Sequence, residues 1–183
     1  YWPSLAGFLA WFDAGSGVLQ FGLLPPGDPL VSSTMEAIER RLWCKTEVGG
    51  VARYEGDDYH RVSDDLERVP GNPSSVCTLW LTDWHVARAR TVEELARARA
   101  FLEIDDRGDA AEHGYVEELA RGRALLEWVV ARALPSGVLV EQIHPYTGNP
   151  LSVSPLTWRD AAFVESAQQY QTRLASPSRS FDA

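Results

Sequence analysis

The chain has 183 residues, of which 45% are hydrophobic and 23% are charged, and it contains seven Trp, six Tyr and six Phe. This composition excludes generic disorder, and because no apolar run approaches ~18 residues it also excludes a membrane-spanning helix. The formal net charge of −9 repels phosphate groups, so nucleic acid and anionic membranes are poor partners.

The beginning of the chain indicates that it is part of a longer protein. It starts at Tyr1, and its single methionine is Met35. We therefore expect a preceding segment and interpret the chain as a C-terminal portion. It has no pattern typical of a signal peptide, which favours the cytoplasm, with any leader lying upstream of Tyr1. Cys44 and Cys77 have neither a zinc nor a CxxC spacing, so we expect reduced thiols in the core.

Helical patterns dominate, so we predict an all-α fold, with one domain over residues 1–175 and a flexible tail over 176–183. Ser33-Thr34-Met35-Glu36 has the pattern of a capping box, in which a hydroxyl and a carboxylate satisfy free amides at a helix start. Thr91 with Glu94 forms a second such pattern. The expected helices cover residues 5–12, 35–43, 76–88, 92–103, 115–133 and 157–174.

The chain contains one internal repeat. Residues 92–103 read VEELARARAFLE and residues 116–127 read VEELARGRALLE, so ten of twelve positions are identical at an offset of 24. We interpret the repeat as a tandem duplication that adds one helix near 92–127. We expect residues 101–123 to lie at the periphery, remote from Glu141. The turn at 104–109 lacks the alternating ligands of a calcium loop, so we predict no metal site there.

A glycine-flanked loop over residues 49–59 is the first candidate for a binding function. Arg53, Asp57 and Tyr59 lie within seven residues and offer donors, acceptors and an aromatic face to a polyhydroxylated ligand. The alternative is a surface turn with solvated charges.

Two further segments contain residues suited to chemistry. Glu141 ends an apolar run and precedes Gln142, and partial burial of such a carboxylate suits a general base. The alternative is a glutamate in a salt bridge. Trp158 follows the helix cap Thr157, where its face would pack against the CH groups of a sugar, and the alternative is a core tryptophan.

Five motifs in the same order resemble the C-terminal half of the catalytic domain of glycoside hydrolase family 15, the glucoamylases and their relatives. The motifs cover most of the chain. They are Thr34-Met35-Glu36-Ala37-Ile38-Glu39; Gly50-Val51-Ala52-Arg53-Tyr54 with Asp57 and Tyr59; Gly71-Asn72-Pro73 with Cys77-Thr78-Leu79-Trp80; Glu141-Gln142; and Leu156-Thr157-Trp158.

The resemblance implies a partial (α/α)₆ barrel, about half of two concentric helix rings. It also implies an inverting, exo-acting hydrolase that releases glucose from an α-glucan or maltooligosaccharide without a metal or organic cofactor. Glu141 would be the catalytic base, and the general acid would lie in a missing N-terminal part of the domain, upstream of Tyr1. The residues implied in substrate binding are Arg53, Asp57, Tyr59, Gln142 and Trp158.

The chain departs from the family pattern at several positions. Ser74 stands where the family has a sugar-stacking tryptophan after Asn72-Pro73, and Arg159-Asp160 replaces Ser followed by His or Tyr. The duplicated helix is also outside the pattern. A non-catalytic carbohydrate-binding or regulatory relative, a trehalase-like member and a helical domain without a sugar role are the alternatives. Glu141-Gln142 favours the enzyme of the glucoamylase type, because trehalase-like members tend to have Glu-Glu at the base.

Overall fold

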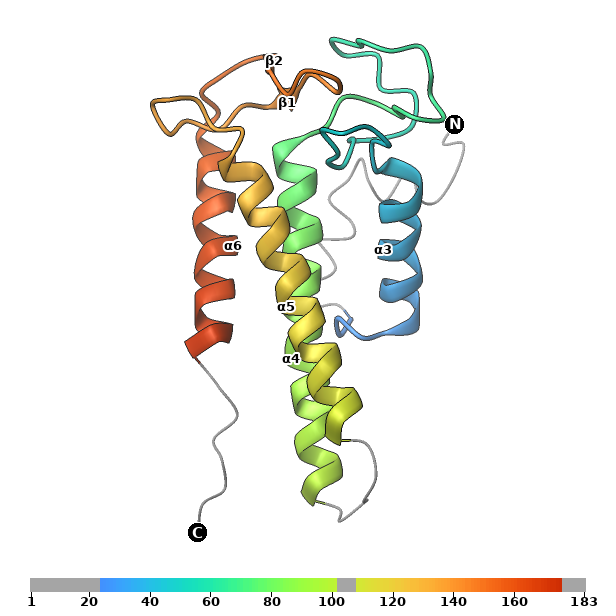
Figure 1. The fold of residues 1–183 in the computed structure, drawn as a ribbon, viewed down its shortest axis with the longest axis vertical. Coiled ribbons are helices and arrows are strands. Elements are labelled where there is room, and N and C mark those ends of the chain that lie inside the picture. The colour runs from blue at the N-terminus through green and yellow to red at the C-terminus, as the bar shows by residue number, and fades with distance from the viewer. Residues whose placement is uncertain (1–23, 102–107, 176–183) are drawn as a thin grey trace.

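The computed structural model describes residues 24–101 and 108–175, which form four helices and one small antiparallel sheet (Figure 1). The described part is therefore mostly helical, as predicted, while the two short strands were not predicted. The expected helix over 5–12 and the tail over 176–183 lie outside the described residues. The elements are α3 (Pro29–Leu42), α4 (Ser75–Phe101), α5 (Gly108–Val130), β1 (Gln142–Ile143), β2 (Pro150–Leu151) and α6 (Thr157–Ala175).

Helix α3 begins six residues before its predicted start. Asp28 is the N-cap and accepts a hydrogen bond of 2.8 Å from the Leu30 amide, and Pro29 follows in the first turn, where its missing N–H has no cost. The predicted capping box at Ser33 is wrong, because the Ser33 hydroxyl lies inside the helix and donates to the Leu30 carbonyl.

Helix α4 is continuous over 27 residues, where two separate helices were predicted. The second predicted capping box, Thr91 with Glu94, lies in its interior. No Gly or Pro separates the two predicted segments, and a surrounding run of Ala, Arg and Glu favours helix. A capping pattern is a local signal, which the neighbouring helical residues outweigh here.

Helices α4 and α5 lie side by side and antiparallel, and the ends nearest their connection point away from the sheet (Figure 1). The described part of the first repeat copy, 92–101, forms the far half of α4, while the second copy, 116–127, lies in α5. The duplication therefore lengthens two helices of one hairpin and does not add a separate helix. This far end lies at the opposite end of the molecule from β1 (Figure 1). The predicted peripheral position of 101–123 holds only in part, because Glu118 and Leu119 are buried and Glu118 contacts His85 of α4.

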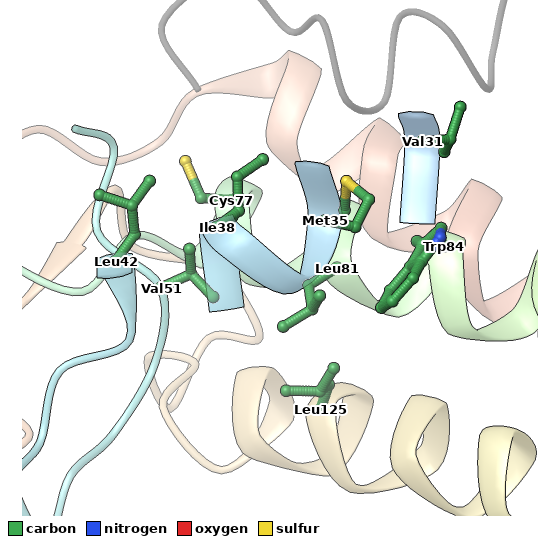
Figure 2. Close-up of a cluster of buried hydrophobic side chains, with 9 residues drawn as sticks. All are labelled: Val31, Met35, Ile38, Leu42, Val51, Cys77, Leu81, Trp84 and Leu125. Carbon is green, nitrogen blue, oxygen red and sulfur yellow. The ribbon is translucent and has the colours of Figure 1, made fainter. Parts of the chain in front are cut away.

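The core fills both sides of this hairpin. One cluster joins α3 to α4 and α5, and it comprises Val31, Met35, Ile38, Leu42, Val51, Cys77, Leu81, Trp84 and Leu125 (Figure 2). A second cluster, Leu79, Leu126, Val129 and Leu139, packs against Phe163 and Tyr170 of α6. Cys44 and Cys77 are buried thiols, as predicted, and burial raises the pKa of Cys44 to about 12.

The long connections gather at the end of the molecule where α4 and α6 begin (Figure 1). Isolated bridges join Ala52 to Pro73 and Ser74 to Gln142, and β1 pairs with β2 in the register Gln142 to Leu151. Gly50 has φ of +92°, and an added Cβ would lie 2.3 Å from the Trp128 ring, so only glycine fits this crossing. The loops therefore form a fixed platform over the helix ends.

Candidate active site

A cavity of about 220 Å³ opens at this loop end. Its walls come from the loop after α3, the first turns of α4 and α6, and the residue before β1. The lining residues are Arg53, Tyr54, Ser74, Val76, Cys77, Trp80, Glu141, Trp158 and Arg159. Three residues predicted from separate sequence motifs, Arg53, Glu141 and Trp158, thus line one cavity.

Asp57 anchors Arg53 in the wall. The carboxylate of Asp57 is wholly buried and accepts from Arg53 Nε at 2.7 Å and from Nη2 at 2.8 Å. It also accepts from the Tyr59 amide and from Gln142 Nε2. Burial alone would lower the pKa of Arg53, but the hydrogen bond and charge of Asp57 raise the pKa above its ordinary value. Arg53 is therefore a fixed cation whose Nη1 remains available to the cavity.

Glu141 contacts a cation on one side and a hydroxyl on the other. Its Oε1 lies 3.7 Å from Arg53 Nη1, and its Oε2 accepts a hydrogen bond of 2.6 Å from Ser152 Oγ. The Glu141 side chain is 17% exposed, so it is accessible from the cavity and partly desolvated. Ser152 Oγ also lies 3.2 Å from the Tyr59 hydroxyl, which places Tyr59 one contact behind the carboxylate.

Gln142 and Asp57 lie behind the cavity wall. Both are fully buried, and Gln142 Oε1 accepts from Asn72 Nδ2 at 3.2 Å while its Nε2 donates to Asp57. Asn72 Nδ2 also donates to the His60 carbonyl at 2.7 Å. This network ties the Arg53 loop to β1. The structure thus places Gln142 and Asp57 where they orient Arg53 and do not line the cavity.

The start of α6 supplies the opposite wall. Trp158 is 54% exposed in the first turn, so its ring face is open to a ligand. The next residue, Arg159, is fully buried although it lines the same cavity. In the sequence, Arg159 stands out only as a departure from the family pattern, to which no role was assigned. Ser152 was not predicted from the sequence, because its residue type does not indicate the left-handed backbone, with φ of +66°, that it adopts.

A larger cavity, of about 390 Å³, lies between α3 and α5. It is lined by Trp43, His85 and Leu125, with Arg40 and Lys45 among its charged residues. It contains none of the residues predicted for sugar binding. We therefore place the candidate active site in the smaller cavity.

None of the helices in the described ranges is both long and apolar enough to cross a membrane. Part of their hydrophobic residues belongs to the two core clusters around the α4–α5 hairpin.

Comparison with known proteins assigns the chain to a family. The model of the family "Glycosyl hydrolases family 15" matches residues 17–168, which include every residue that lines the candidate site. An uncharacterized glycosyl hydrolase of Methanocaldococcus jannaschii is 29% identical over 144 residues, which is 79% of this chain and 19% of that relative. No solved structure matches the chain significantly. The motifs, the cavity that joins them and the match over most of the length agree: this chain belongs to glycosyl hydrolase family 15.

Proposed function

We propose that this chain supplies the catalytic base and part of the sugar-binding wall of an inverting, exo-acting α-glucosidic hydrolase. The observation that carries the proposal is the position of Glu141, a partly exposed carboxylate in one cavity with Arg53 and the open face of Trp158. A carboxylate, a fixed guanidinium and an aromatic face are the groups that a pyranose ring needs for hydrolysis, hydrogen bonding and stacking.

Glu141 has the geometry of a base that is held in place. Ser152 occupies Oε2 through a short hydrogen bond, while Oε1 lies 3.7 Å from Arg53, beyond hydrogen-bond distance. Oε1 therefore keeps a lone pair for a water molecule. In an inverting reaction this carboxylate takes the proton of the water that attacks the anomeric carbon, and the glycosidic oxygen leaves as it is protonated by an acid.

The acid belongs, in this proposal, to a segment outside this chain. Inverting enzymes hold their two carboxyl groups roughly 6.5–9.5 Å apart, so that a water molecule fits between base and sugar. The helices described here would form part of an (α/α)₆ barrel, with the missing part closing the cavity. The isolated chain would then release negligible glucose from maltooligosaccharides.

The rest of the wall serves sugar binding. Arg53, oriented by Asp57 and Gln142, directs Nη1 toward ligand hydroxyls, and Trp158 stacks on a ring face. Tyr59 supports the base through Ser152. The reaction needs no metal or organic cofactor, because two carboxyl groups and water complete it.

Substitution of Glu141 tests the proposal. In the full-length protein, Glu141→Gln keeps the hydrogen bond with Ser152 possible but removes the base, so kcat on maltooligosaccharides should fall at least about 100-fold with little change in KM. Glu165→Gln, an exposed change on α6, is the control and should leave kcat unaltered. Near-normal kcat in Glu141→Gln would place the base elsewhere.

A non-catalytic carbohydrate-binding domain is a second candidate, because Ser74 lines the cavity where a stacking aromatic is the family pattern. The glucose-release assay, together with a measurement of maltose binding, separates the hydrolase from the non-catalytic domain. Binding of maltose to the wild-type protein without any release of glucose would favour this second candidate.

A further inference from the structure

The cavity contains one charged side chain whose hydrogen-bonding capacity is unused. Arg159 is 0% exposed, and its Nε, Nη1 and Nη2 atoms have no hydrogen-bond partner. Burial lowers the pKa of its guanidinium, yet an arginine stays protonated in proteins. A desolvated cation without an acceptor is costly, so its presence in a cavity wall indicates a partner that binds there.

The other charges of the cavity do not satisfy Arg159. The guanidinium of Arg53 is paired with Asp57, and one oxygen of Glu141 is taken by Ser152. Asp160, the neighbouring carboxylate, accepts from the Leu139 amide. Glu141 and Asp160 act on Arg159 only through longer-range attraction. Within the described ranges, all three nitrogen atoms of Arg159 thus lack a hydrogen-bond acceptor.

The backbone at this point adds a second attraction for negative charge. Arg159 is the third residue of α6, a 19-residue helix whose first amides point toward the same end of the molecule as the cavity. A helix start of this kind favours an anion, and a guanidinium next to it offers a planar fork of donors. A neutral hydroxyl supplies one acceptor and no charge, whereas a carboxylate or phosphate oxygen pair matches the fork.

We propose that Arg159 forms a subsite for a negatively charged group carried by the sugar, so that the preferred substrate is an acidic saccharide with a carboxylate or a phosphate ester. This inference rests on the proposed function, because it names the substrate class of the same cavity. Arg53 and Trp158 bind the sugar ring, Glu141 stays free for water, and Arg159 binds the acidic substituent on the α6 side.

Calorimetric titration of the full-length protein tests this subsite with matched ligands. The three probes are methyl α-glucoside, methyl α-glucuronide and glucose 6-phosphate. We expect at least one of the two anionic sugars to bind about tenfold or more tightly than the neutral one, as charge-assisted hydrogen bonds are stronger than neutral ones. The tighter of the two identifies the anionic group as carboxylate or phosphate.

Two substitutions assign the preference to Arg159. Arg159→Met should abolish the tighter binding of anionic sugars, while binding of methyl α-glucoside persists. Arg159→Lys should keep part of this tighter binding, since lysine retains the positive charge without the planar set of guanidinium donors. Arg40→Met, an exposed change on α3, is the control and should leave the preference intact. Circular dichroism checks that each variant folds, and where Arg159→Met does not fold, Arg159→Lys decides.

The outcomes separate this inference from the proposed function. Equal affinity for neutral and anionic sugars, with maltooligosaccharides still hydrolysed, overturns the subsite and leaves the hydrolase standing. Inorganic phosphate that binds as tightly as glucose 6-phosphate also overturns it, because the sugar then contributes nothing. If the full-length protein neither binds the three probes nor hydrolyses maltooligosaccharides, both the subsite and the proposed function are overturned.

Discussion

The repeat can be removed in two ways that give chains of equal length but different packing residues. Deletion of 92–115 retains Gly122 and Leu125, whereas deletion of 104–127 retains Ala98 and Phe101 in their place. The two products are identical elsewhere. In both, a turn near Thr91 would connect the near half of α4 to the helix that leads into Trp128, and connections of 2–8 residues are usual between such helices.

The structure predicts that the first deletion gives the more stable protein. A Cβ on Gly122 would lie 3.0 Å from Val86 Cγ2 on α4, and Leu125 belongs to the main core cluster. Alanine gains roughly 1 kcal/mol of helix propensity over glycine, but the close contact opposes this gain. Phenylalanine in place of a packed leucine costs about 1–3 kcal/mol. We therefore expect deletion of 104–127 to be about 1–2 kcal/mol less stable.

Thermal unfolding of the two full-length deletion proteins measures the difference. A loss of 1–2 kcal/mol corresponds to a Tm lower by about 2–8 °C for a domain of this size. The deletion of 92–115 should also keep glucose release close to that of the parent, because it preserves the 2.6 Å contact between His85 and Glu118 and leaves the loop end untouched. Equal Tm values would refute the packing argument, and loss of folding in both proteins would refute the peripheral role of the repeat.

Substitutions at two further positions test the support of the base and the charge of the core. Ser152→Ala should lower kcat about tenfold, because it removes the hydrogen bond that holds Oε2 of Glu141. Ser152→Gly should be equally slow but about 1 kcal/mol more stable than Ser152→Ala, because glycine tolerates φ of +66°. Full activity in either variant would contradict the role of Ser152. Burial raises the pKa of Asp83 from 3.8 to about 7, so its protonated form favours folding, and this contribution is lost as the pH rises through that interval. Asp83→Asn should therefore raise the free energy of unfolding by about 2–4 kcal/mol at pH 8 and much less near pH 4, and denaturant titrations that give the same gain at both pH values would contradict this.

The sequence predicted the helical class and most helices because apolar spacing and composition are local. The predicted start of α3 was wrong, because Pro29 in the first turn and Asp28 as N-cap together start the helix earlier. The predicted break in α4 was also wrong, because Thr91 and Glu94 form a capping pattern inside a continuous helix. In a chain that lacks one copy of the repeat, Thr91 would stand before the second helix. The duplication thus explains why a start signal lies in a helix interior.

Three residues that line the candidate site could be predicted from the sequence, but the geometry of the site could not. Arg53, Glu141 and Trp158 belong to motifs that resemble one family, and the fold brings them to one cavity. That Asp57 lies behind Arg53 depends on a loop closed by contacts across the chain. The contact of Ser152 with Glu141 depends on a left-handed backbone at Ser152, which no spacing rule reveals.

The configuration of the first glucose released tests the central claim most directly. Proton NMR of the full-length protein acting on maltooligosaccharides resolves the anomeric signals before mutarotation mixes them. If Glu141 activates a water molecule opposite the leaving group, the β anomer appears first and the α anomer follows only as mutarotation proceeds. An α anomer that appears first would mean retention through a covalent intermediate and would contradict the role proposed for Glu141.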